Sequence, residues 1–117
     1  QNPEPHQPYV SNELLYIVVR AGDTWKSISK EFDISQSKLR EYNDLYKGYN
    51  LQVGDILYLE KKKRKASKDN IVHVLRSGES MYTVSQKYGI RLKNLYKLNK
   101  MSPEDPAPAL GTILRLR

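Results

Sequence analysis

The chain repeats one short pattern twice, and this repeat constrains its fold more than any other feature of the sequence. A shift of 56 residues, which becomes 57 near the end of the second copy, superimposes eleven identical residues. In the first copy they are Val18, Arg20, Gly22, Ser29, Ile34, Leu39, Asn43, Gly54, Ile56, Leu57 and Leu59. Glycines and apolar residues, which dominate this set, determine turns and cores. The repeat therefore predicts two small units of the same fold, over 14–60 and 71–117.

The order of patterns inside each copy predicts a strand, two helices and a second strand. In the first copy, an apolar run at 14–19 predicts a strand, and a glycine turn follows it. Trp25, Ile28 and Phe32 are spaced by three and four residues, which places them on one face of a short helix. A second helix and a strand at 56–59 complete the unit. We expect an α+β fold in which each unit has a two-stranded antiparallel sheet with two helices on one face.

Two further segments are predicted to be linkers. Residues 1–13 contain three prolines and carry a net charge of −2, and we expect them to lead in from an upstream region. Residues 61–70 carry a net charge of +5, and like charges repel and extend such a run. The chain as a whole carries +7, so its basic character lies in this second linker and in the second copy.

Several classes of function are excluded by composition. The 117 residues include no cysteine and only two histidines, which excludes disulfides, thiolate zinc sites and multi-histidine metal sites. Its apolar runs are too short to span a bilayer, and the first residues carry no signal-peptide pattern. The acidic residues are scattered rather than paired across one cleft, so we expect no catalytic residues, no metal and no cofactor.

Both copies carry a turn motif before the first helix and a glycine motif before the last strand. The first copy has Gly22-Asp23-Thr24-Trp25 and Val53-Gly54-Asp55-Ile56-Leu57. The second has Gly78-Glu79-Ser80-Met81 and Leu110-Gly111-Thr112-Ile113-Leu114. In order and spacing these residues resemble the LysM (lysin motif) family over about 90 residues. The second copy and the lysine-rich segment also resemble the C-terminal region of Bacteroidetes cell-wall glucosaminidases, which are peptidoglycan hydrolases.

The resemblance implies a βααβ fold that binds N-acetylglucosamine glycans, in peptidoglycan or chitin, in a shallow groove between two loops. Carried onto this sequence, the first groove is lined by Gly22, Asp23, Thr24, Trp25, Asp44, Leu45 and Tyr46. The second groove is lined by Gly78, Glu79, Ser80, Met81, Lys100, Met101 and Ser102. The resemblance also implies a monomer in the cell envelope, periplasmic or extracellular, that holds an upstream hydrolase on its substrate, with no membrane partner.

Two pairs of equivalent residues at the start of the first helix of each copy admit more than one interpretation. Trp25 and Met81 have the spacing of core residues, but they also stand where a sugar would contact the loop. For Asp23 and Glu79 we favour a role as charges or caps at a helix N-terminus over a role as reacting acids.

Other polar and aromatic residues are assigned from their position in the pattern. Asn43 and Asn99 end the second helix of each copy, and we expect their side chains to hold the following loop by hydrogen bonds. Tyr46 and Tyr49 lie in a loop, which makes them candidates for stacking on sugars. His73 is expected to be an ordinary sheet residue.

A second function from another class stays open at this point. A basic adaptor would bind nucleic acid or a protein partner through residues 61–68 and the second copy, with an affinity that falls steeply with salt. We favour the glycan because the repeated motif covers most of the chain, and nucleic acid is the weaker expectation.

Overall fold

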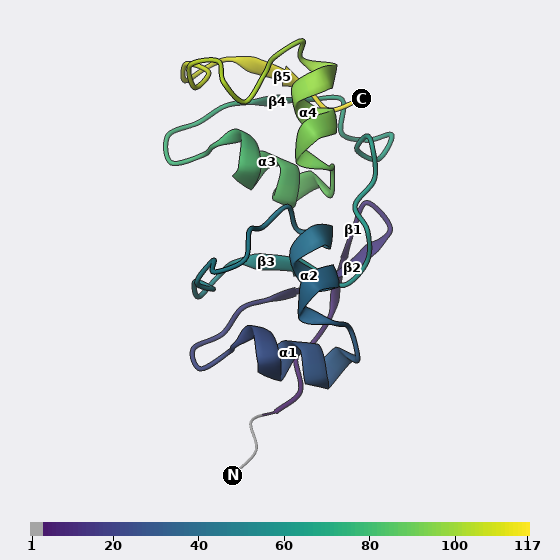
Figure 1. The fold of residues 1–117 in the computed structure, drawn as a ribbon. Coiled ribbons are helices and arrows are strands. Elements are labelled where there is room, and N and C mark those ends of the chain that lie inside the picture. The colour runs from purple at the N-terminus through teal and green to yellow at the C-terminus, as the bar shows by residue number, and fades with distance from the viewer. Residues whose placement is uncertain (1–3) are drawn as a thin grey trace. The chain divides into compact units, whose positions relative to one another are not determined.

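The computed structural model describes residues 4–117 and divides the chain into two compact units, Gln1–Lys61 and Lys62–Arg117. Each unit is a small α+β fold that contains the order strand, helix, helix, strand, which confirms the fold class predicted from the repeat (Figure 1). Among the described residues, none of the helices is long and apolar enough to cross a bilayer.

Unit 1 contains β2 (Leu14–Val18), α1 (Trp25–Phe32), α2 (Gln36–Tyr42) and β3 (Ile56–Tyr58). β2 and β3 pair antiparallel, with Ile17 opposite Leu57. The sheet has a third strand that the sequence analysis does not predict, β1 (Tyr9–Ser11), and the strand order is β1-β2-β3.

The expectation that residues 1–13 form a linker therefore differs from the structure of the described part, 4–13. β1 pairs antiparallel with β2 through a two-residue turn, so that Ser11 lies opposite Leu14. Both turn residues, Asn12 and Glu13, have positive φ angles of 55° and 63°, which matches the twist of a tight hairpin. Prolines are rare inside strands, so the three prolines of this segment predict a linker although the short run Tyr9-Val10 is β-forming.

The helices of unit 1 begin and end at residues whose chemistry explains the boundary. The side chain of Thr24 accepts from the Ser27 backbone N–H at 3.0 Å, and the Ser27 hydroxyl accepts from the Thr24 N–H at 3.0 Å. This reciprocal cap satisfies two donors at the start of α1. Asp33 ends α1 in the left-handed conformation, and the Ser35 side chain then caps α2.

The core of unit 1 lies between the sheet and the two helices. Its buried members are Ile17, Val19, Ile28, Leu39 and Leu57. Full burial of each of these side chains stabilises the unit by roughly 1.5–3 kcal/mol.

Asn43 ties the end of α2 to β3 below this core. Its amide Nδ2 donates to Leu39 O at 2.8 Å and to Tyr58 O at 3.0 Å, and its Oδ1 accepts from the Tyr58 N–H at 2.7 Å. The structural role predicted for Asn43 is confirmed, but these three bonds connect α2 with β3 rather than with the loop that was expected.

Unit 2 repeats this plan with β4 (Val72–Val74), α3 (Met81–Tyr88), α4 (Leu92–Leu98) and β5 (Ile113–Arg115). β4 and β5 pair antiparallel in a two-stranded sheet. Ser80 and Thr83 form the reciprocal cap of α3, and Gly89 ends α3 in the left-handed conformation. The buried core of the unit consists of Ala66, Leu75, Met81, Val84, Ile90, Leu95, Leu114 and Leu116.

The segment 61–70 also differs from the solvated linker that its charge predicts. Lys62 is only 1% exposed, and its ammonium donates to the Gln86 Oε1 at 2.7 Å. Lys63 forms an isolated parallel bridge with Ile90, and Ala66 belongs to the core of unit 2. A lysine can be buried in this way because its aliphatic stem packs like an apolar side chain while its charged end finds an acceptor. The basic run therefore contributes structure to unit 2.

Candidate binding groove

The turn before α1 and the loop before β3 face each other across a shallow hollow in unit 1. The hollow has a volume of about 230 Å³ and is lined by Asp23, Thr24, Trp25, Tyr49, Asn50 and Leu51. Gly22 comes directly before these lining residues and has a φ of 88°, a backbone conformation that residues other than glycine rarely adopt. The tight turn is what brings the start of α1 to the edge of the hollow.

One side of this hollow agrees with the residues predicted from the sequence, and the other side differs in detail. Asp23, Thr24 and Trp25 line it as expected, but the facing residues are 49–51 rather than 44–46. Leu45 instead packs against the core of unit 1. Tyr46 is 69% exposed, and its ring contacts the ring of Tyr49 edge-on at 5.8 Å between centroids. The sugar-binding role of all these residues stays a prediction.

Trp25 takes part in both the core and the hollow. Its ring packs against the core of unit 1, and its indole N–H donates to the Tyr49 carbonyl at 2.8 Å. The two interpretations of this residue are therefore compatible, because the ring fills space under the groove while one edge lines it. The hydrogen bond also fixes the distance between the two sides of the hollow.

The far side of the hollow is held by a carboxylate. Asp55 Oδ2 accepts from the Tyr49 hydroxyl at 2.8 Å and from the Gln52 backbone N–H at 2.9 Å. Burial and the hydrogen bond to Asp55 raise the pKa of Tyr49 to about 12. The hydroxyl of Tyr49 therefore remains protonated at neutral pH and is committed to this contact.

In unit 2 the equivalent residues are more closely engaged in the fold. Met81 is 4% exposed and belongs to the core, and Met101 packs against the same core. Lys100 lies in the left-handed region with a φ of 54°, and the backbone N–H of Ser102 donates to Asp105 at 2.8 Å. Of the two interpretations of Met81, the structure supports packing. Gly78 has a φ of 83°, as expected for the turn.

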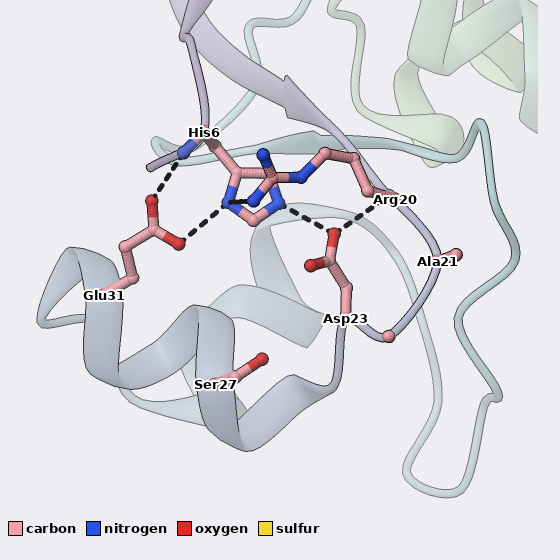
Figure 2. Close-up of a pocket in the computed structure, with 7 residues that line it drawn as sticks. His6, Arg20, Ala21, Asp23, Ser27 and Glu31 are labelled. Carbon is pink, nitrogen blue, oxygen red and sulfur yellow. Dashed lines mark hydrogen bonds and ion pairs between the residues drawn. The ribbon is translucent and has the colours of Figure 1, made fainter. Parts of the chain in front are cut away.

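The acids of the two turns hold backbone and histidine groups. Asp23 Oδ2 accepts from the Arg20 N–H at 2.6 Å and lies 2.7 Å from His6 Nε2 (Figure 2). The equivalent acid Glu79 accepts from a backbone N–H in the same way and also contacts a histidine. His6, Asn50 and Leu51 are missed by the sequence analysis. A loop pattern does not identify which residues face each other, and His6 lies outside the repeat.

A comparison with known protein families identifies the family to which this fold belongs. The model of the family described as LysM domain matches residues 17–59 and 73–117, which together exceed half of the chain. The chain belongs to the LysM domain family. Both matches fall on the βααβ units, and the first includes both sides of the hollow.

Curated relatives share the tandem LysM region over most of this chain. An autolysin of Enterococcus faecalis is 31% identical over 91 residues, which are 72% of this chain and 12% of that protein. The probable peptidoglycan endopeptidase LytE of Bacillus subtilis is 28% identical over 106 residues, 86% of this chain and 31% of LytE. The membrane-bound lytic murein transglycosylase D of Escherichia coli is 27% identical over 92 residues, 75% of this chain and 20% of the enzyme. The matched region is thus less than a third of each relative.

Proposed function

We propose that this chain is a non-catalytic glycan-binding module that recognises N-acetylglucosamine-containing polymers, peptidoglycan first and chitin second. The observation that carries the proposal is the hollow of unit 1, because it lies between the same two loops in which the LysM resemblance implies the groove. Relatives named as an autolysin, a peptidoglycan endopeptidase and a murein transglycosylase favour peptidoglycan as the polymer.

The chemistry of the hollow suits an acetylated amino sugar. An acetamido group needs a hydrogen-bond donor for its carbonyl, an acceptor for its N–H and an apolar spot for its methyl group. Loop backbone and the side chains of Thr24 and Asn50 offer polar groups, and Trp25 and Leu51 offer apolar surface. A shallow site of this kind binds weakly alone, but a second tethered copy raises the avidity on a polymer that repeats its sugar.

The same proposal places the module in the cell envelope, where it holds a wall hydrolase on its substrate. The named relatives are much longer than the matched region, and their printed names are those of wall-degrading enzymes or autolysins. The two turn acids, Asp23 and Glu79, are engaged by backbone N–H groups and histidines. We therefore assign binding rather than bond cleavage to this chain.

Binding to insoluble peptidoglycan tests the proposal directly. The chain should sediment with peptidoglycan sacculi at moderate salt and should be released by soluble N-acetylglucosamine oligomers. In unit 1, replacing Asn50, whose exposed side chain lines the hollow, by alanine should weaken retention. Val53→Ser is the matched control, because Val53 is 72% exposed in the same loop and does not line the hollow.

A charge control separates this function from that of a basic adaptor. Lys61→Ser with Arg64→Ser removes two exposed basic side chains of the lysine-rich segment and leaves the buried Lys62 in place. Glycan binding should be unchanged in this variant, whereas binding to an acidic partner through this segment would weaken and fall steeply with salt. The glycan proposal would be contradicted if the charge variant lost its binding to sacculi while Asn50→Ala bound them as well as the wild-type chain does.

A further inference from the structure

Each unit holds the turn before its first helix through a histidine paired with the acid of that turn. In unit 1, Asp23 Oδ2 accepts from the Arg20 N–H at 2.6 Å, and His6 Nε2 lies 2.7 Å from the same oxygen (Figure 2). The His6 and Asp23 side chains are only 4% and 9% exposed. The carboxylate therefore links the turn backbone to an imidazole that is almost fully buried.

Unit 2 contains the same link. Glu79 Oε1 accepts from the Arg76 N–H at 2.8 Å and lies 2.8 Å from His73 Nε2. The hydrogen bonds from His73 and from the Arg76 N–H lower the pKa of Glu79, so this carboxylate stays charged at neutral pH. Arg76 and Glu79 occupy the positions in the repeat that Arg20 and Asp23 occupy in the first copy.

The two histidines reach this position from places in the chain that are not equivalent. His73 lies in β4, opposite Leu114, where the first unit has Ile17 opposite Leu57. His6 instead comes from the segment before β1, outside the repeat. The same contact is thus built twice by different routes, which indicates that the contact itself matters to the turn and is more than a by-product of duplication.

The segment that carries His6 is anchored to α1 as well as to the turn. The His6 backbone N–H donates to Glu31 Oε2 at 2.9 Å, and His6 Nδ1 lies 2.8 Å from Glu31 Oε1. The imidazole also contacts the ring of Phe32, with 6.1 Å between centroids. His6 therefore joins the first helix to the turn that leads into it, and that turn continues into Thr24 and Trp25 of the hollow.

We propose that His6 and His73 are positioning residues for glycan binding, each of which fixes the turn at the edge of its unit's candidate groove through the turn acid. This inference rests on the proposed function, because it concerns the same groove. His6 does not touch the ligand in this account. It acts by keeping the turn of unit 1 ordered before the glycan arrives, which lowers the entropic cost of binding.

The groups around the two imidazoles differ between the units. His6 faces the carboxylates of Asp23 and Glu31 on its two ring nitrogens, and Arg20 Nη2 lies 3.3 Å from Nδ1. The ring therefore joins the acid of the turn to an acid of α1.

His73 lies between one carboxylate and one hydroxyl. Its Nε2 faces Glu79, while its Nδ1 lies 2.8 Å from the hydroxyl of Tyr88, which donates as readily as it accepts. The ammonium of Lys87 lies over the Tyr88 ring, 5.5 Å from its centroid. The ring of His73 thus links the turn acid to α3, as the ring of His6 links its turn acid to α1.

Titration of the full chain with a soluble N-acetylglucosamine oligomer, followed by amide NMR shifts, reads the two units separately. His6→Ala should weaken the affinity at the unit 1 turn by about three- to tenfold and leave unit 2 unchanged. His6→Gln retains a donor and should recover part of the affinity. Gln7→Ala, an exposed neighbour on the same segment, is the matched control.

A measurement without ligand makes the inference independent of the glycan. Hydrogen exchange of the Arg20 amide, which donates to Asp23, should accelerate in His6→Ala and not in Gln7→Ala. If the wild-type chain binds no glycan, the proposed function fails, and this exchange rate still decides whether His6 holds the turn. Equal oligomer affinities for His6→Ala and Gln7→Ala would overturn the inference.

Discussion

Replacing Asn43 by alanine should remove three buried hydrogen bonds from unit 1. The Asn43 side chain is fully buried and makes three hydrogen bonds, to Leu39 O, to Tyr58 O and from the Tyr58 N–H. Alanine would leave the backbone donor and acceptor of Tyr58 without this partner in a place that water does not reach. These bonds connect the end of α2 with β3, so the helix and the sheet would separate.

The size of the expected loss of stability follows from the burial of the Asn43 side chain. Each buried polar group left without a partner costs about 1–3 kcal/mol, so Asn43→Ala should lower the free energy of unfolding of unit 1 by roughly 3 kcal/mol. Asn99 makes the equivalent three bonds in unit 2, to Leu95 O, to Arg115 O and from the Arg115 N–H. Two of these bonds are solvent-exposed, so water replaces part of what is lost. We expect about 1 kcal/mol for Asn99→Ala.

Urea unfolding measures the difference between the two variants. Trp25 is the only tryptophan of the chain, so its fluorescence reports on unit 1, and amide hydrogen exchange reports on unit 2. Asn43→Ala should move the fluorescence midpoint by several molar, or abolish the folded baseline, since a small unit has an m-value of only about 1 kcal/mol/M. Asn99→Ala should leave that midpoint in place and accelerate exchange in unit 2.

Two results would refute this reasoning. One is a fluorescence midpoint for Asn43→Ala within about 0.5 M of the wild-type value, which would mean that the buried bonds contribute little net stability. The other is a loss of unfolding free energy for Asn99→Ala in unit 2 that equals the loss for Asn43→Ala in unit 1. That result would mean that burial does not increase the cost of removing these hydrogen bonds.

Three further predictions concern stability and titration. Lys62→Ala should lower the free energy of unfolding of unit 2 by about 2 kcal/mol, measured by amide exchange, while Lys61→Ala changes it by less than about 0.5 kcal/mol. Burial above all raises the pKa values of Tyr49 and Tyr58 to about 12, so absorbance titration should show both ionising after the other tyrosines. Their neutral forms stabilise unit 1 below the ordinary tyrosine pKa of 10.0, and this contribution is lost as the pH rises towards 12. Glu79 has a lowered pKa, chiefly because it accepts a histidine hydrogen bond, so its contribution is present above the ordinary glutamate pKa and is lost as the pH falls through the lowered value. During an acid titration, the carboxyl NMR shift of Glu79 should change at a lower pH than that of an ordinary glutamate.

The sequence predicts the parts of this fold that depend on neighbours along the chain. The turn at Gly22 and the cap at Thr24 are each encoded within a few residues of where they act. The contacts it misses join distant segments. His6 meets Glu31 across 25 residues, and Lys62 meets Gln86 across 24. Composition is a poor guide at both places, because a segment rich in prolines or lysines is predicted to be a linker even when one of its residues is buried.

The groove was predictable on one side only for the same reason. The turn at 22–25 follows directly from a local motif, and the structure places three of its four residues in the hollow. The facing loop is long, and its pattern does not determine which of its residues turn inwards. Leu45 and Leu51 have the same side chain and both pack against the core, but of the two it is Leu51 that also lines the hollow.

The hairpin of β1 with β2 and the burial of Lys62 bear on how this protein should be cut for study. A fragment trimmed to the family match at 17–59 would lack His6, the strand Tyr9–Ser11 and the buried Leu14. A fragment trimmed to 73–117 would lack Lys62 and Ala66. Isolated pieces with those ends would measure the affinity of damaged domains, whereas division between Lys61 and Lys62 keeps each folding unit whole.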